Sequence, residues 1–357
     1  MLKVEFDEVN SSFLVTQGDD ENGFEITPYN YIPNCKNIFS NLKDEDFDIV
    51  LLNNPFLHKE VNWFVIKFDD SEERGGFLFP ISLLESVEIE DKYLLSYMFV
   101  AYRQLLSRIS EKLTGVLSDS YPNAYILAIH KQTKPDFHLN DYALSLAFYG
   151  FYDYKGGIDT RYPKLNCIEN LTKIICLKKA SIDNLQNGYV NDLVFTRLCL
   201  TSDFLTRFVL VYQTVELYIS EIHYNLLEDR IDKYKRSKLT RNDFSEELKN
   251  ISRESYQIEQ LVKGFHDEKV CTNYKNIVCS LFNDVGYSID DKSKSLDSLL
   301  YALRNQLFHN YGIFNGHEDA LNQVIFSFER VILMLLSKKL INNQNLNHEV
   351  TGNEGHV

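Results

Sequence analysis

The sequence predicts an α+β fold, in which a β-rich N-terminal module precedes an all-α helical bundle. Short runs of β-branched and aromatic residues, bounded by Asn, Asp, Gly and Pro, recur through the first half and are typical of strands. In the second half, apolar residues recur every three or four positions from Phe204 to Ile222, the spacing of one buried helix face. This change of period predicts two domains, with the boundary near residues 181–200.

The first domain is expected to span residues 1–185 and to act as a sensing or regulatory module. One helix is expected over residues 93–113, inserted among strands rather than alternating regularly with them. Seven runs are expected to form strands, at residues 13–15, 47–52, 63–68, 76–79, 125–129, 144–149 and 173–177.

The second domain is expected to span residues 201–340 and to contain helices only. Thr201, Ser202 and Asp203 supply capping residues for the first helix, which follows the stripe from Phe204 to Ile222. Four more helices are expected, at residues 244–265, 273–282, 299–309 and 319–340. Residues 341–357 are polar and rich in Asn, and we expect them to form a disordered tail.

The charge balance restricts how this chain can meet nucleic acid. It has 51 acidic and 37 basic residues, a formal net charge of −14. A protein that coats nucleic acid through bulk charge is basic, so that class is excluded. Any RNA-binding surface must be a local patch on an acidic body.

A soluble, cytoplasmic protein without a membrane partner is expected. The six cysteines form no Cys-x-x-Cys pair, which is typical of reduced thiols in a cytosolic protein. The first residues turn acidic at once and lack the apolar run of a signal peptide. The most apolar stretch, Val324 to Leu336, is interrupted by Glu329 and Arg330.

The segment Arg304-Asn305-Gln306-Leu307-Phe308-His309-Asn310-Tyr311 concentrates chemistry near the end of an expected helix. Arginine carries a permanent planar charge that suits phosphate oxygens, and histidine changes charge near neutral pH. Together they supply what cleavage of a phosphodiester without a metal requires, a proton carrier and a cation that faces the charge building on phosphorus.

The spacing of the two residues has a geometric consequence. Arg304 and His309 are five positions apart, about 140° around a regular helix, whereas Asn305 and His309 share a face. Arg304 and His309 therefore reach one phosphate only if the helix loosens before Gly312, or if a second copy of the chain faces the first. Asn305 is placed to hold the imidazole or to touch the phosphate.

The helical segment, with Leu303-Arg304-Asn305 followed by His309, resembles the HEPN superfamily. The pattern of that superfamily is an Arg, often followed by Asn, Asp or His, and then a His after four to six intervening residues. Here there are four. Arg304 and His309 match its catalytic pair, and Asn305 matches its polar second position.

The resemblance implies a metal-independent endoribonuclease that acts as a homodimer, with both motifs lining a cleft between subunits and no cofactor. Its RNA substrate, possibly tRNA, would be left with a 2′,3′-cyclic phosphate and a 5′-hydroxyl, and DNA would be inert. Tyr311 matches the Arg-x4-His-x-Tyr form of HEPN toxins, whose tyrosine is adenylylated by a nucleotidyltransferase antitoxin.

The order of the two domains is similar to that of bacterial abortive-infection proteins of the ApeA type. By this analogy of architecture, residues 1–185 would sense a phage-derived trigger, and RNA cleavage would serve antiviral defence or a toxin system.

Two other clusters carry weaker expectations. Five cations interleaved with Tyr234 form either an RNA-contacting edge or a solvated helix end: Lys233, Lys235, Arg236, Lys238 and Arg241. His130, Asp136, His138 and Asp141 lie within twelve residues but lack a second ligand cluster, so we expect a structural role and no metal.

A rival interpretation remains open, in which the second domain is a non-catalytic HEPN-like module for dimerisation or partner binding. The two interpretations differ in whether Arg304 and His309 are open to solvent or face a packed core.

Overall fold

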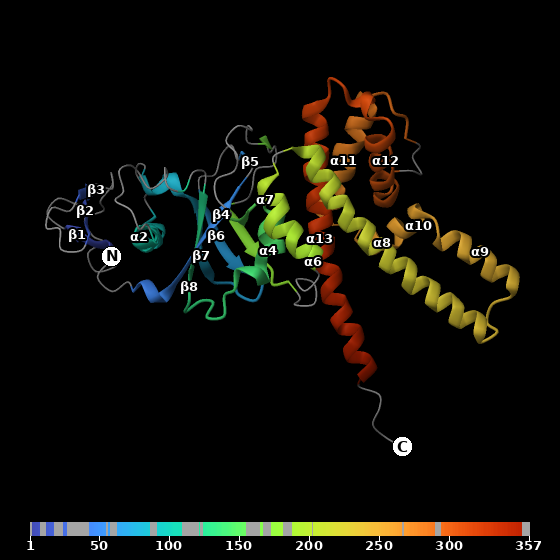
Figure 1. Cartoon of the computed structure of the whole chain (residues 1–357), viewed down its shortest axis with the longest axis horizontal. Coiled ribbons are helices and arrows are strands. Elements are labelled where there is room, and N and C mark those ends of the chain that lie inside the picture. The colour runs from blue at the N-terminus through green and yellow to red at the C-terminus, as the bar shows by residue number, and fades with distance from the viewer. Residues whose placement is uncertain are drawn as a thin grey trace, which may run out of the picture. The chain divides into compact units, whose positions relative to one another are not determined.

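The computed structural model of the chain (Figure 1) describes the backbone of residues 2–7, 12–17, 24–26, 43–54, 56–57, 63–85, 91–108, 121, 124–154, 165–166, 173–180, 188–201, 203–265, 268–289 and 294–351. The chain divides into two compact units, one made of residues 1–186 and 194–202 and the other of residues 187–193 and 203–357. The main division thus lies next to the expected boundary.

A six-stranded mixed sheet organises the first unit, in the order β11-β6-β7-β8-β4-β9. Strand β11 pairs parallel to β6, and the remaining neighbours pair antiparallel. The strands are β4 (Phe47–Asn53), β6 (Phe64–Phe68), β7 (Arg74–Pro80), β8 (Ala124–His130), β9 (Tyr152–Asp153) and β11 (Ile174–Leu177). Two smaller sheets contain β1 (Leu2–Asp7), β2 (Ser12–Gln17) and β3 (Phe24–Ile26), and β5 (Phe56–Leu57) with β10 (Leu165–Asn166).

Successive side chains along each strand point to opposite faces of the large sheet, so each face has its own hydrophobic core. Phe77 and Phe79 of β7 face helix α2 (Lys92–Arg108), whereas Leu78 between them faces helix α4 (Leu139–Phe148). The sheet is therefore buried on both faces, which is why its central strands are apolar at consecutive positions. The remaining short elements of this unit are the 3-10 turns η2 (Asp44–Asp46) and η3 (Ile81–Glu85) and the helix α7 (Leu198–Leu200). A π-helical turn, η4 (Leu193–Arg197), precedes α7.

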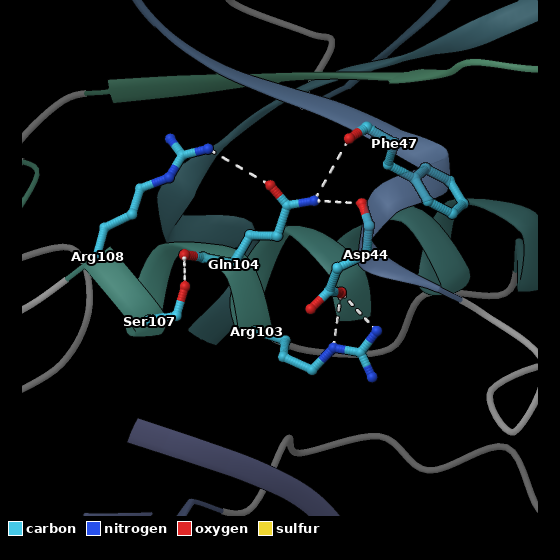
Figure 2. Close-up of polar contacts among 6 residues, drawn as sticks. All are labelled: Asp44, Phe47, Arg103, Gln104, Ser107 and Arg108. Atoms are coloured by element: carbon cyan, nitrogen blue, oxygen red, sulfur yellow. Dashed lines mark hydrogen bonds and ion pairs between the residues drawn. The ribbon is translucent and has the colours of Figure 1, made fainter. Parts of the chain in front are cut away.

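Polar side chains fasten α2 to the start of β4 (Figure 2). The amide of Gln104 donates to the carbonyl oxygens of Asp44 at 2.9 Å and Phe47 at 3.4 Å. The guanidinium of Arg103 pairs with the Asp44 carboxylate, its Nε lying 2.7 Å away. Arg108 donates to the carbonyl oxygen of Ile49 at 3.1 Å. These bonds satisfy carbonyls at the edge of the sheet and lie in a helix–strand junction, so we assign them a structural role.

The expected strand at residues 144–149 is wrong, because this segment lies in helix α4 and the turn that follows it. Every residue from Tyr142 to Ala147 is buried. A fully buried helix is apolar all round, so its sequence resembles that of a buried strand. The Ala and Leu residues of this run are strong helix formers, and they decide the outcome.

The second unit is a helical bundle, and all its described elements are helices or turns (Figure 1). They are α6 (Gly188–Asp192), α8 (Phe204–Lys235), α9 (Arg241–Ile251), α10 (Glu254–Val262), α11 (Lys269–Asp284), α12 (Leu296–His309), the 3-10 turn η6 (Tyr311–Phe314) and α13 (Glu318–Thr351). The molecule is thus a mixed α+β protein. Helix α13 continues past residue 341, and residues 352–357 of the expected tail lie outside the described residues.

Helix α8 begins as its sequence predicts, since the Asp203 carboxylate caps it by accepting from the Thr206 amide at 2.6 Å. Its apolar stripe packs against α13, where the two helices also exchange a buried ion pair. The Arg207 guanidinium donates to both oxygens of Glu329, at 2.9 and 2.6 Å. A charge that interrupts the apolar run of α13 is therefore neutralised inside the bundle.

One described stretch, residues 318–337 of α13, is long and apolar enough to cross a membrane, and 72% of its most apolar window is buried inside the protein. Such burial is that of a core helix in a soluble protein.

The single helix expected over residues 244–265 is instead two. Helix α9 ends at Ile251, and α10 begins at Glu254 after Ser252 and Arg253. The Gln257 side chain donates to the Ile251 carbonyl oxygen at 2.8 Å, which satisfies a carbonyl freed by the break. The interruption places Glu254 in the first turn of a helix that packs against α12.

Candidate functional site

Helix α12 carries the Arg304 motif and buries one apolar stripe in the bundle, made of Leu296, Leu299, Leu300, Leu303 and Leu307. Arg304 directly follows a member of that stripe and lies at its border. Its side chain is consequently about one quarter exposed. The guanidinium is neither in the core nor free in solvent.

Four side chains surround the Arg304 guanidinium. The Glu254 Oε1 atom lies 3.7 Å from Arg304 Nε, which makes an ion pair but is too long for a hydrogen bond. The rings of Phe308 and Tyr212 lie 5.3 and 5.9 Å from the guanidinium carbon, within cation–π range. Arg304 Nη1 donates to Asn305 Oδ1 at 3.0 Å, so Asn305 holds the arginine in this state rather than the imidazole.

One donor of Arg304 is left without an acceptor. Its Nε atom is shielded from solvent and makes no hydrogen bond within the described part of the chain. An unmet donor of this kind costs about 1–3 kcal/mol. The Nε atoms of Arg230 and Arg304 share this state, and each lies next to a glutamate rather than solvent.

Glu254 is itself held by a buried phenol. The hydroxyl of Tyr212 on α8 donates to Glu254 Oε1 at 2.7 Å. Burial, and the carboxylate that accepts its hydrogen bond, raise the pKa of the Tyr212 phenol well above its ordinary value. The phenol therefore stays protonated, and it remains a donor across the physiological range of pH.

His309 is the last residue of α12 and is exposed. The Asn310 amide still donates to the Gln306 carbonyl oxygen at 2.9 Å, so the helix is regular up to His309. Of the two ways to bring Arg304 and His309 together, loosening of the helix is absent from this structure. Within one chain the two side chains diverge by about 140°.

Two exposed aromatic rings flank His309. Phe308 is 49% exposed and Tyr311 is 42% exposed, values that are high for such large apolar side chains. Tyr311 opens the turn η6 and packs edge-on against Phe314, with ring centroids 6.3 Å apart. The side chain of Tyr311 is therefore partly exposed, as modification of this tyrosine would require.

The five cations after residue 232 lie at the tip where α8 turns into α9 (Figure 1). Lys233 pairs with Asp229 at 2.7 Å, and Arg236 pairs with Asp232 at 3.9 Å. Lys235, Lys238 and Arg241 are exposed. Since α8 is continuous, Lys235 lies about 35 Å along the helix from Tyr212, so this tip is remote from Arg304.

The cluster at residues 130–141 does not converge on a metal site. His130 Nδ1 accepts from the Gln132 amide at 3.1 Å, and Asp141 pairs with Lys179 at 2.8 Å. Among the described residues, no group of three or more His, Cys, Asp or Glu side chains is arranged to hold a metal ion.

A groove of about 590 Å³ lies beside α10, and its lining includes Arg253 and Ser255 on either side of Glu254. Both charge signs line it: Arg230, Arg253, Glu247, Glu259 and Asp297. Arg230 is already paired with Asp229 and Glu247. The groove therefore has no preference for an anion.

Glu254 and Tyr212 are the site residues that sequence reasoning missed. The sequence signals for both were weak. Ser252 and Arg253 interrupt an otherwise helical pattern directly before Glu254, and Tyr212 lies in an expected helix without breaking its apolar stripe.

No protein-family model, no curated protein and no solved structure matches this chain. The argument for function therefore rests on the side chains of the site.

Proposed function

We propose that the second unit is a metal-independent endoribonuclease of HEPN type that acts as a homodimer. The observation that carries this proposal is the presence, on one helix, of a partly exposed arginine and an exposed histidine five residues later. Arg304 supplies a phosphate-binding cation that its surroundings have not fully used. His309 supplies a proton carrier that RNA can reach.

The reaction requires no group beyond these side chains and the RNA. The ribose 2′-oxygen attacks the adjacent phosphorus and gives its proton to the neutral imidazole of His309. As the bond to the 5′-oxygen breaks, the imidazolium returns that proton to the leaving oxygen. Arg304 stabilises the extra negative charge on the phosphoryl oxygens in between. The products are a 2′,3′-cyclic phosphate and a 5′-hydroxyl end.

The divergence of Arg304 and His309 on α12 supports a dimeric site. If two copies face each other across this helix end, Arg304 of one chain and His309 of the other can meet at one phosphate. The exposed rings of Phe308 and Tyr311 supply apolar area next to the motif, where bases stack or subunits meet.

Cleavage of labelled tRNA and of a single-stranded RNA by the purified full-length chain, in EDTA, tests the proposal. We expect cyclic phosphate ends, no cleavage of the same sequence as DNA, and loss of activity in Arg304→Ala and His309→Ala. Arg197→Ala, at an exposed arginine of the turn η4, is the matched control. Undiminished cleavage in either motif variant, or no cleavage by a folded, dimeric wild type, contradicts the proposal.

The shared site makes a sharper test possible. In a mixed dimer of Arg304→Ala and His309→Ala chains, one of the two sites regains both wild-type residues if each site draws on two subunits. Mixing the two inactive proteins should then restore up to half of the wild-type activity. Inactive mixed dimers would instead place both residues of each site on one chain.

Anti-phage defence, or a toxin whose Tyr311 is adenylylated by a nucleotidyltransferase antitoxin, is the biological setting we propose. The exposed phenol of Tyr311 favours the second setting. A mass increase of one adenylyl group on Tyr311 after co-expression with such an enzyme, absent in Tyr311→Phe, is the expected result.

A second candidate is a non-catalytic module that dimerises or docks a partner. Its support is that Glu254 already neutralises Arg304, while Phe308 and Tyr311 present apolar surface. It predicts that Phe308→Ala disrupts self-association, whereas Arg304→Ala has no effect on any RNA.

A further inference from the structure

Arg304, Glu254 and Tyr212 come from three different helices and form one contact chain. Tyr212 lies on α8, Glu254 opens α10 and Arg304 lies on α12. The phenol donates to the carboxylate at 2.7 Å, and the same carboxylate oxygen lies 3.7 Å from the arginine Nε. The phenol is thus bonded to the glutamate, whereas the glutamate attracts the arginine without a direct bond.

The distribution of bonds over Glu254 Oε1 explains this difference. The oxygen nearest to Arg304 is the one that accepts from the Tyr212 hydroxyl. A carboxylate oxygen accepts more than one hydrogen bond, so the phenol does not fill it. Its bond instead anchors the carboxylate where the nearest oxygen lies 3.7 Å from Arg304 Nε, beyond hydrogen-bond distance. The charge of Glu254 therefore attracts and orients the guanidinium, but the Arg304 Nε atom makes no hydrogen bond within the described part of the chain.

We propose that Glu254 is a positioning residue for Arg304, and that Tyr212 keeps its carboxylate from closing onto the guanidinium. This inference rests on the proposed function, because it takes Arg304 to be the cation that receives an RNA phosphate. Glu254 aims the arginine, and Tyr212 leaves it available for that phosphate. A direct hydrogen bond between Glu254 and Arg304 would compete with binding of the RNA phosphate.

The two residues have opposite expected effects on RNA affinity. In Glu254→Gln the negative charge beside Arg304 is gone, so RNA should bind about threefold to tenfold more tightly. In Tyr212→Phe the carboxylate is released to bond with Arg304, so RNA should bind more weakly by a similar factor. In the double variant no charged carboxylate competes, and the affinity should return to that of Glu254→Gln.

Cleavage should respond differently from affinity. Without Glu254 the guanidinium loses the charge that orients it, so kcat should fall by at least about tenfold while KM falls too. A merely structural role for Glu254 would lower kcat and raise KM together. A fall in kcat together with a fall in KM would therefore identify Glu254 as a positioning residue.

The experiment measures binding of a fluorescent RNA with 2′-O-methyl groups, which lacks the attacking hydroxyl, to the full-length chain. Cleavage of the unmodified RNA is measured in parallel. Glu259→Gln on α10 and Tyr218→Phe on α8 are matched controls, since they alter the same residue types on the same helices away from Arg304. Neither control should change affinity beyond twofold.

The outcomes separate this inference from the proposed function. If the wild type binds and cleaves RNA but Glu254→Gln and Tyr212→Phe move affinity in the same direction, or not at all, the inference fails and the ribonuclease stands. If the wild type binds the modified RNA without cleaving the unmodified one, the ribonuclease fails, and opposite shifts in affinity still support the device. If the wild type binds no RNA, both fail. A thermal melt of each variant shows that it is folded.

Discussion

Two of the Arg–Glu pairs that bridge helices of the bundle differ in nearly every physical respect. Arg207 and Glu329 are buried, and the guanidinium donates to both carboxylate oxygens at 2.6 and 2.9 Å. Arg304 and Glu254 are about one quarter exposed and lie 3.7 Å apart at their closest atoms. Arg207 and Glu329 are joined by two hydrogen bonds, whereas Arg304 and Glu254 are too far apart for a direct one. A buried ion pair with complete hydrogen bonds stabilises the fold, whereas a partly exposed pair without a direct hydrogen bond can still bind a ligand.

The largest effect on stability should follow from breaking the buried pair. Glu329→Gln leaves the Arg207 charge inside the bundle without its counterion, which should destabilise the protein by about 3–5 kcal/mol. Urea unfolding followed by circular dichroism measures this loss. The double variant Arg207→Met with Glu329→Leu restores an uncharged core and should recover most of it. A loss as large in the double variant would show that packing, not charge, dominates.

The largest effect on activity should follow from Arg304→Ala, with little effect on stability. Loss of the cation that faces the phosphoryl oxygens should slow RNA cleavage by about 10²–10³-fold. A surface pair contributes about 0–1 kcal/mol, so the unfolding midpoint should change little. The comparison of the two pairs fails if Arg304→Ala destabilises the bundle as strongly as Glu329→Gln.

His309→Asn should slow cleavage by about 10²–10⁴-fold without weakening RNA binding, because the imidazole moves protons rather than contributing charge to affinity. Binding of the 2′-O-methyl RNA and cleavage of the unmodified RNA separate the two. His317→Asn, beyond the turn η6, is the matched control and should retain activity. A strong loss of binding in His309→Asn would assign it to recognition.

The smallest effect should come from the remote tip between α8 and α9. Replacing Lys235 and Lys238 together by Ala should weaken RNA binding by only a few-fold and reduce its salt dependence, since the two lysines contribute charge but lie far from Arg304. Titrations at several salt concentrations measure this. No change at all would make the tip a solvated helix end, and a loss as large as that of Arg304→Ala would make it a main binding surface.

Periodicity predicted most helices of the second unit, because α8, α11 and α12 each bury an apolar stripe, but it missed the break between α9 and α10. It failed at residues 144–149, where burial on all sides removes the stripe and leaves an apolar run common to strands and helices. The sequence also indicated Arg304 and His309 as candidates, since their residue types and spacing are local properties. It did not identify Glu254 and Tyr212, which lie 50 and 92 positions before Arg304 and join it only through helix packing.

The two-residue interruption between α9 and α10 has a consequence for how this chain can vary in length. A residue added there must either bulge out of this short connection or extend the start of α10. Such an extension would shift Glu254 by about 100° around the helix and carry its carboxylate away from Arg304. The turn at Ser237, which joins α8 to α9 at the remote tip, has no such constraint on the site. In chains that share this bundle, insertions and deletions should therefore collect at the tip and be absent between Ile251 and Glu254.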